Sequence, residues 1–298
     1  MTTHTKEDLR ANLKGSFFMV AAMAGFAVED TFLKAASTTI PVGQIMIVFG
    51  LGGALLFACA ARLKNERLYS PDVMSRPMRV RAFFEITGRL FYVLALALTP
   101  LSAATVILQA TPIVVVAGAA LVFGETVGWR RWGAIIIGLL GVVVIIQPGA
   151  EGFSMLSILA VLGMLGFAGR DLASRAAPAS LSALILGLYG FLSVAVAGLL
   201  FAIWDRAAFV SPGIPAWLCL LGAVLAGVLS YACLMKAMRT GEVSAVTPFR
   251  YTRLIFGVGL GVVLFGERLD LSMLAGCALI VLSGLFILWR GKKAKAQG

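Results

Sequence analysis

Charged side chains lie within long apolar stretches of this sequence, where they could pair with one another, bind a charged solute or carry protons. The segment GFAVEDTFLKAA, residues 25–36, places Glu29, Asp30 and Lys34 in a stretch that is mainly apolar from Gly15 to Ala36. Further polar or ionisable residues deep in such stretches are Glu85, Arg89, Gln109, Arg170, Asp171, Lys236, Arg250, Tyr251 and Arg253. An uncompensated charge at the centre of a bilayer costs roughly 2.5–3.5 kcal/mol. In a membrane, these side chains must therefore face one another or water rather than lipid.

The residue types that most enzymes and metal sites require are scarce. His4, in the N-terminal tail, is the single histidine, and the four cysteines lie in apolar stretches without paired spacing. We therefore expect no metal centre, no histidine proton relay and no nucleophile activated by histidine. The phosphate-binding pattern G-x-x-x-x-G-K-[ST] does not occur, and GVGLG at 257–261 lies inside an apolar stretch. We expect neither ATP nor a cofactor to be bound.

The composition indicates a membrane protein that crosses the bilayer many times. Hydrophobic residues make up 60% of the 298 residues and charged residues 13%, whereas soluble domains have about 45–50% and about 25%. The apolar stretches have the length of membrane-spanning helices, and the alternation of a barrel strand is absent. We expect ten spans, at residues 14–35, 42–61, 82–98, 102–123, 132–148, 154–173, 182–204, 215–238, 243–265 and 271–289.

The net charge of +11 is explained by its placement along the chain. With a cytoplasmic N-terminus, most basic residues fall in segments between spans on the cytoplasmic side, including 62–81 and 290–295. Lys34, Arg206 and Arg268 would then lie on the outer side. This distribution follows the positive-inside rule, so both termini are expected in the cytoplasm. No nucleic-acid partner is needed to explain the charge.

Three pairs of segments recur at nearly the same distance along the chain. They are GFAVEDTFLKAA (25–36) and GFAGRDLASRAA (166–177), SAAT (102–105) and SAVT (244–247), and LVFGE (121–125) and VLFGE (263–267). The first pair lies 141 residues apart and the other two 142 residues apart. Matches that include polar residues at a constant offset indicate an internal duplication.

The duplication divides the chain into halves at about residues 1–150 and 151–298. Each half holds five expected spans, and because five is odd, the second half enters the membrane from the opposite side. The expected fold class is an all-α polytopic membrane protein, with ten helices in two inverted five-helix repeats around a central cavity. Inverted repeats are typical of secondary transporters.

The segments SAAT…LVFGE and SAVT…VLFGE, with the acidic residues and lysine that end the first span, resemble the EamA type of the drug/metabolite transporter superfamily. The likeness covers essentially the whole chain, and within the superfamily the chain is similar to YddG-type amino-acid exporters. The resemblance implies that spans 1, 3, 4, 6, 8 and 9 line a central cavity, while spans 5 and 10 pack outside. It also implies export of amino acids and related metabolites across a bacterial inner membrane.

An amino acid presents a carboxylate, an ammonium group and a variable side chain. Arg89 or Arg250 could bind the carboxylate, and Glu29 or Glu85 the ammonium group. Glu85 and Arg89 are also spaced to neutralise each other on one helical face. The remaining candidate substrate-binding residues are Gln109 and the aromatic residues Phe26, Phe84, Tyr231, Phe249 and Tyr251.

The repeat also predicts a gate. Asp30 and its counterpart Asp171 are expected at opposite mouths of the cavity, where ion pairs with nearby bases would form at one mouth while breaking at the other. The candidate bases are Lys34, Arg170 and Arg175. For Lys34 and Arg175 the alternative is a charge at a helix end that reaches toward the membrane surface.

Helix breakers lie in the fourth and ninth spans. Pro112 and Pro248 each remove a backbone hydrogen bond, and Gly257 begins a run of closely spaced glycines. These residues are candidate hinges, although proline and glycine are also common in static membrane helices.

These observations favour a secondary transporter of small molecules that works by alternating access, in contact with membrane lipid. A carrier of drugs or metabolites of another class is the nearest alternative. A membrane-embedded enzyme would need a catalytic cluster that the sequence does not provide, and a channel would not explain the inverted duplication.

Overall fold

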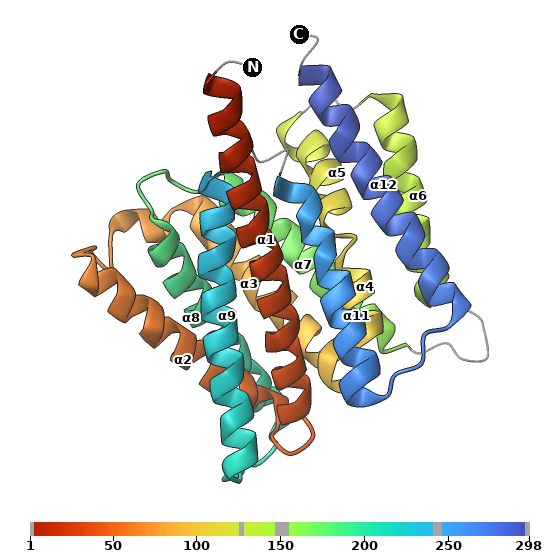
Figure 1. Ribbon diagram of the computed structural model, residues 1–298. Helices are drawn as coiled ribbons and strands as arrows, with labels where there is room; N and C mark the ends of the chain where they lie inside the picture. The colour runs from red at the N-terminus through yellow and green to blue at the C-terminus, as the bar shows by residue number, and fades with distance from the viewer. Residues whose placement is uncertain (1–2, 125–127, 147–154, 241–245, 296–298) are drawn as a thin grey trace.

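The computed structural model describes residues 3–124, 128–146, 155–240 and 246–295, and every regular element in these ranges is helical (Figure 1). The elements of the first half are α1 (Thr3–Ala36), α2 (Val42–Leu63), η1 (Pro71–Met74), α3 (Arg76–Leu98), α4 (Leu101–Leu108), α5 (Thr111–Phe123) and α6 (Trp129–Ile146). Those of the second half are α7 (Ser157–Arg175), α8 (Ala183–Asp205), α9 (Ile214–Thr240), η2 (Thr247–Tyr251), α11 (Thr252–Phe265) and α12 (Leu271–Lys295). The helical fold class is confirmed for these ranges.

Seven spans within the described residues are long and apolar enough to cross a membrane. They are Arg10–Ala36, Val42–Leu63, Leu101–Val122, Ser157–Ser174, Ala183–Asp205, Ile214–Ala237 and Thr247–Phe265. Trp132–Ile146 and Leu271–Ile287 are apolar but shorter. Helix α3 is long enough but carries many charges, among them Arg81, Glu85 and Arg89. The count of ten spans therefore stays a prediction.

The fourth expected span is broken between α4 and α5, one turn before Pro112. Proline has no backbone N–H, so it cannot donate to the carbonyl of Leu108 four residues earlier. The Thr111 hydroxyl donates to that carbonyl instead, at 2.5 Å. Pro112 lies in the first turn of α5 and Pro248 in the first turn of η2, where no N–H is needed. Of the two, Pro112 follows a break between two described helices.

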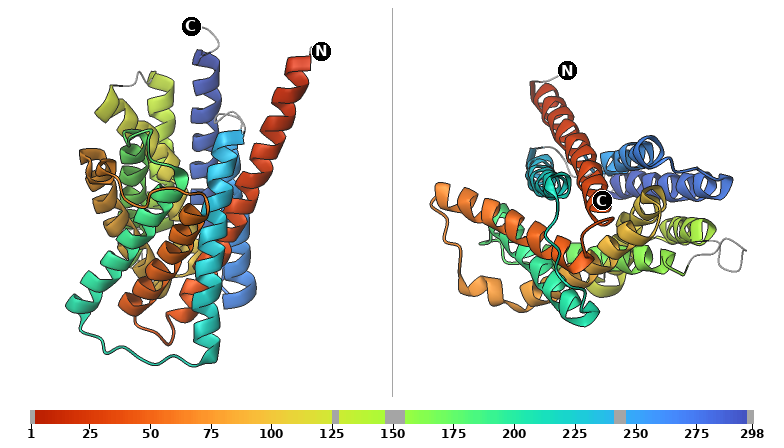
Figure 2. Two further views of the ribbon diagram at one scale, coloured as in Figure 1. Left: turned by 90° about the vertical axis from the view of Figure 1, so that its left-hand side faces the viewer. Right: turned by 90° about the horizontal axis from the view of Figure 1, so that it is seen from below.

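Helices from the two halves pack against each other in exchangeable pairs. The main pairs are α1 with α9, α3 with α7, α2 with α8, and α6 with α12. Exchanging each helix for its counterpart turns the first pair into the second and leaves the other two unchanged. A two-fold relation between the halves would produce this pattern. Figure 2 shows α2 and α8 on one side of the bundle and α6 and α12 on the other, and both termini lie at the same end (Figure 1).

Glycines allow the closest approaches between helices. A Cβ added to Gly166 of α7 would lie 2.2 Å from the Cα of Gly88 in α3, so these two backbones touch. Gly257, a candidate hinge, lies inside the regular helix α11, where an added Cβ would come within 2.6 Å of Thr105. Small residues at membrane helix crossings commonly serve this role. Close packing against α4 therefore explains Gly257 without a hinge.

The repeated F-G-E segments end their helices in the same way. Gly124 follows α5 with φ of +67°, and Gly266 follows α11 with φ of +62°. This left-handed conformation strongly favours glycine. Glu125 lies outside the described residues, whereas Glu267 is placed and binds α4, as described below.

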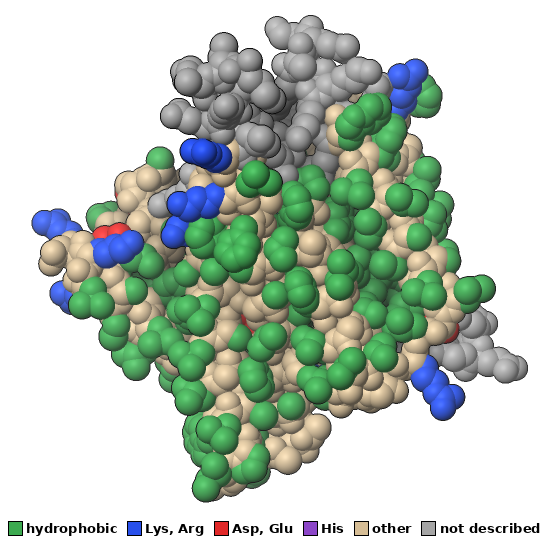
Figure 3. Space-filling model, in the orientation of Figure 1, with side chains coloured by type: hydrophobic (Ala, Val, Ile, Leu, Met, Phe, Trp, Pro, Cys, Tyr) green, Lys and Arg blue, Asp and Glu red, His purple; other side chains and the backbone are tan. Residues whose placement is uncertain are grey.

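Hydrophobic side chains cover most of the face shown in Figure 3, and Lys and Arg side chains lie toward its edges. Large exposed apolar residues on the helices include Leu55, Ile136, Leu140, Leu199, Ile203, Leu229 and Val263. An apolar surface of this extent is expected of a protein that is surrounded by lipid.

Candidate functional site

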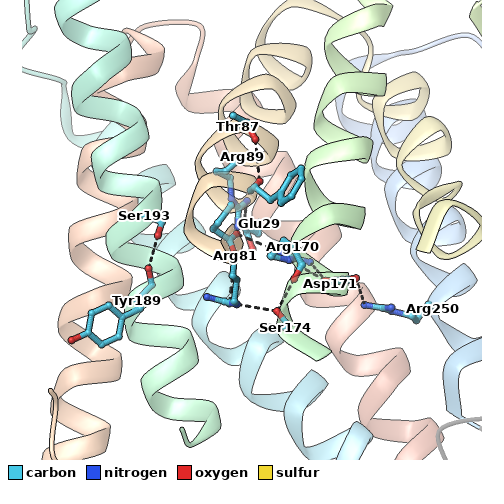
Figure 4. A network of polar contacts seen from close by, with 12 residues as sticks. Glu29, Arg81, Thr87, Arg89, Arg170, Asp171, Ser174, Tyr189, Ser193 and Arg250 are labelled. Carbon is cyan, nitrogen blue, oxygen red and sulfur yellow. Dashed lines mark hydrogen bonds and ion pairs between the residues drawn. The ribbon is translucent and has the colours of Figure 1, made fainter. Parts of the chain in front are cut away.

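Charged residues from both halves meet inside the bundle. They come from α1, α3, α7 and the segment formed by η2 and α11. Figure 4 shows Arg170 and Asp171 at the centre of part of this network, with Arg250 reaching Asp171 from the other side. The ion pairs form two groups, which we name the α1 cluster and the α7 cluster.

The α1 cluster consists of Glu29, Asp30, Arg89, Tyr92 and Arg253. Arg253 donates to Asp30 Oδ2 at 2.5 Å, and the Tyr92 hydroxyl donates to the same oxygen at 2.9 Å. Arg89 Nη1 lies 2.7 Å from Glu29 Oε1. The Glu29 and Asp30 side chains are 1% and 0% exposed. Two buried acids therefore face two arginines, and the charges of the cluster cancel.

The α7 cluster consists of Arg81, Glu85, Arg170, Asp171 and Arg250. Glu85 pairs with Arg81 at 3.5 Å and with Arg170 at 3.4 Å. Asp171 pairs with Arg170 at 2.8 Å and with Arg250 at 3.8 Å. The side chains of Arg170, Asp171 and Arg250 are between 22% and 28% exposed. This cluster is therefore more open to solvent than the α1 cluster.

The structure changes the partner expected for Glu85. Glu85 pairs with Arg81, four residues before it, and not with Arg89, four residues after it. Arg89 is drawn away because Glu29 of α1 lies within 2.7 Å of it. Arg81 was expected in a cytoplasmic segment, but its side chain is only 5% exposed and donates to Ser174 at 3.0 Å. In the sequence, the four-residue spacing between Arg81 and Glu85 could have indicated this pair.

Phe167 is a site residue that the sequence analysis missed. Its ring lies under the Arg170 guanidinium at 4.8 Å and the Arg89 guanidinium at 5.8 Å. Phe26, its counterpart in the repeat, holds Arg253 at 5.3 Å. Both phenylalanines therefore make cation–π contacts with arginines of the network. Phe167 could have been predicted from the sequence, because it aligns with Phe26 in the repeat.

The other predicted wall residues do not all reach the network. Tyr231 stacks edge-on against Phe57, with the ring centroids 5.4 Å apart. Phe84 packs against Gly169, and Tyr251 packs against Gly284 of α12. The side chain of Phe249 is 40% exposed. Tyr231 thus packs against Phe57, and the ring of Tyr251 packs against α12.

Gln109 fixes the position of η2. It caps the end of α4 and donates to the backbone carbonyl of Arg250 at 3.1 Å. The break between α4 and α5 therefore meets the start of the η2–α11 segment. This contact holds the backbone that carries Arg250.

The two gate acids contact the same short segment of chain. Asp30 pairs with Arg253 and Asp171 with Arg250. The position of the two acids at opposite mouths of the cavity stays a prediction. The side chain of Arg175 lies outside the described residues.

Lys34 and Glu267 hold the junction of α3 and α4. Lys34 donates to the carbonyls of Leu96 and Thr99 at 3.1 and 2.6 Å. Glu267 accepts hydrogen bonds from the first two backbone amides of α4, at 2.6 and 2.9 Å, and lies 4.0 Å from Lys34. A cation at a helix end and an anion at a helix start are both favourable. Lys34 is therefore paired inside the protein and is not simply reaching toward the membrane surface.

Replacing Glu267 with alanine is expected to destabilise the protein by about 1–2 kcal/mol, because two buried helix-start amides lose a charged acceptor. Thermal unfolding in detergent measures the effect. Glu267→Gln retains one acceptor oxygen and should lie between the wild type and Glu267→Ala. An unchanged melting temperature in Glu267→Ala would contradict the contact.

Metal binding is not supported by the geometry. Across the part of the chain that the structure describes, there is no group of three or more His, Cys, Asp or Glu residues that could hold a metal ion. The acids of the network face arginines instead.

A helical bundle with an apolar surface and a charged interior is the architecture of a membrane transporter. The chain belongs to the EamA-like transporter family, whose sequence profile matches residues 13–147 and again residues 154–289. It is therefore a multi-pass membrane transporter.

Characterised relatives transport several kinds of small molecule. The chain is 29% identical to a riboflavin transporter of Vibrio cholerae, over 96% of both chains. It is 25% identical to an S-adenosylmethionine uptake transporter of Rickettsia prowazekii, over 98% of both chains. It is 28% identical to the pseudopaline exporter CntI of Pseudomonas aeruginosa, over 90% of this chain and 94% of the relative.

A solved structure titled only "Crystal structure of protein" shares the fold, with a TM-score of 0.64, 21% identity, and coverage of 94% of this chain and 98% of the other. The narrower resemblance to YddG-type exporters is not supported by the relatives named above. The named relatives carry different solutes, so we infer the solute of this protein from the site.

Proposed function

We propose that this protein is a secondary carrier that exports amino acids and related metabolites across the bacterial inner membrane by alternating access, without ATP. The observation that carries the proposal is the charged network between the two halves, in which arginines and acids from α1, α3, α7, η2 and α11 meet inside an apolar bundle. Charged side chains inside a membrane cost free energy, so a network of them indicates a functional site.

Two inverted repeats, at residues 1–150 and 151–298, provide the mechanism. Two observations support them: the family profile matches twice, and the helix pairs exchange between the halves. Equivalent halves in opposite orientations can exchange their conformations, which gives two states that are related by a two-fold rotation around one central site. Both termini then lie in the cytoplasm, in line with the positive-inside distribution.

Ion pairs between the halves are the parts that must change partners as the carrier opens. Arg253 joins α11 to Asp30 of α1, and Arg170 joins α7 to Glu85 of α3. Lys34 and Glu267 close the junction of α3 and α4. When the halves move, each residue of these pairs exchanges one buried ion-pair contact for another. This exchange keeps the free-energy difference between the two states of the carrier small.

A solute with both a carboxylate and an ammonium group suits this mixture of arginines and acids. Amino acids have both groups, and S-adenosylmethionine, carried by one relative, has them too. The neutral ring system of riboflavin, carried by another relative, matches the charged network less well.

The test is exchange transport by the full-length protein in proteoliposomes. Vesicles loaded with unlabelled L-phenylalanine should take up labelled L-phenylalanine saturably and without ATP. A carrier that releases labelled solute inside the vesicle can bind unlabelled solute there and carry it out. A parallel panel contains L-leucine, riboflavin and S-adenosylmethionine, with and without a pH gradient. Exchange of riboflavin alone would overturn the amino-acid assignment, and no saturable exchange of any solute would overturn the carrier.

A further inference from the structure

The α7 cluster has more positive charge than its acids neutralise. Among the residues that the structure describes, Arg81, Arg170 and Arg250 share the carboxylates of Glu85 and Asp171. The α1 cluster has no such excess. A guanidinium without full neutralisation inside a membrane protein attracts an anionic group. The α7 cluster is therefore the part of the network in which an arginine can take a carboxylate as a further partner.

Arg250 is the arginine with the weakest partner. Its Nη2 lies 3.8 Å from Asp171 Oδ2, which is beyond hydrogen-bonding distance. Arg170 holds the other oxygen, Oδ1, with two hydrogen bonds of 2.8 and 3.0 Å. Asp171 is thus fixed from one side, and its Oδ2 faces Arg250 without a hydrogen bond from the described residues.

The side chains of Arg250 and Asp171 are partly exposed, and both groups are held in place. The side chains of Arg250 and Asp171 are 28% and 22% exposed, whereas the acids of the α1 cluster are almost completely buried. Gln109 fixes the backbone of Arg250, and Arg170 fixes the carboxylate of Asp171. A site whose groups are already positioned loses little entropy when a ligand binds.

We propose that the carboxylate of an amino-acid solute binds Arg250 while its ammonium group binds Asp171 Oδ2, so that the solute inserts into this loose ion pair. The inference rests on the proposed function. It assigns recognition to the α7 cluster and leaves Glu29 and Arg89, which are 2.7 Å apart, as a structural pair. One weak ion pair is replaced by two charge-assisted contacts, which favours binding.

Displacement of labelled L-phenylalanine from the purified full-length protein tests the proposal. The competitors are L-phenylalanine, phenethylamine, which lacks the carboxylate, and 3-phenylpropanoate, which lacks the ammonium group. In Arg250→Gln, the affinities for L-phenylalanine and 3-phenylpropanoate should fall about 10- to 100-fold, as expected for a lost charged contact. The affinity for phenethylamine should stay within about threefold, because this amine makes no contact that depends on a carboxylate.

Asp171→Asn should give the converse pattern, with weaker binding of L-phenylalanine and phenethylamine and little change for 3-phenylpropanoate. Arg62→Gln, at an exposed arginine in the last turn of α2, is the matched control and should bind all three as the wild type does. Circular dichroism and the melting temperature establish that each variant is folded, since a misfolded variant would weaken the binding of all three ligands alike.

Two outcomes separate this inference from the proposed function. If L-phenylalanine is exchanged by the wild type but both variants weaken all three ligands equally, or none, the assignment to Arg250 and Asp171 is wrong while the carrier stands. If the wild type neither binds nor exchanges any amino acid of the panel, the proposed function fails and the assignment fails with it.

Discussion

Replacing Arg253 with alanine should destabilise the protein by about 3–5 kcal/mol, the range measured when one partner of a buried ion pair is removed. Asp30 is completely buried, and its Oδ2 would lose the 2.5 Å contact with the guanidinium. Its Oδ1 already has no hydrogen-bond partner among the residues that the structure describes. Tyr92 alone would then hold the carboxylate. Reversible unfolding in mixed detergent micelles, followed by circular dichroism, gives the free energy of unfolding.

Two further variants identify the cause. Asp30→Ala with Arg253→Ala removes both charges and should be less destabilised than Arg253→Ala alone, because no unpaired charge remains. Arg268→Ala, at an exposed arginine outside the network, should change the free energy by less than about 0.5 kcal/mol. A double variant no more stable than Arg253→Ala would contradict this explanation.

Gly166→Val should abolish transport, and even Gly166→Ala should reduce it at least tenfold. An added Cβ would lie 2.2 Å from Gly88 Cα and 2.5 Å from its nitrogen, so the backbones of α3 and α7 must separate. That separation stretches the 3.4 Å pair between Glu85 and Arg170, which joins the same two helices. Overpacking also costs about 1–3 kcal/mol of stability. Exchange transport and thermal unfolding measure the two effects.

Gly259→Ala is the matched control for this prediction. Gly259 lies in α11, and a Cβ added there meets no atom within 4 Å. Alanine is favoured over glycine within a helix by about 1 kcal/mol, so this variant should be as stable as the wild type or slightly more stable. Equal loss of transport in Gly166→Ala and Gly259→Ala would show that close approach at Gly166 is unimportant.

Local features of the fold could be predicted from the sequence because their causes are local. The break before Pro112 follows from a missing backbone donor, and it lies within one turn of that proline. The helix ends at Gly124 and Gly266 follow from a conformation that other residues adopt only with strain. The charged residues were likewise correctly expected to face one another inside the bundle.

The pairing of the charges could not be predicted in the same way. Glu85 has an arginine four residues away on either side, at Arg81 and Arg89, and both spacings suit a helical pair. The choice depends on α1, which brings Glu29 to Arg89, and on α7, which brings Arg170 to Glu85. Arg81 was assigned to a cytoplasmic segment because hydropathy alone does not distinguish a buried arginine from an exposed one.

The sequence by itself determined that the chain is helical, lies in a membrane, consists of two similar halves and keeps charges in its interior, because composition, periodicity and repetition are properties of the chain alone. Only the tertiary structure decided which acid neutralises which arginine, that Asp30 and Asp171 meet one segment, and that Arg250 is left loosely paired. Ion-pair energies depend on distances of a few ångströms between helices far apart in the chain, and only the packing of those helices sets these distances.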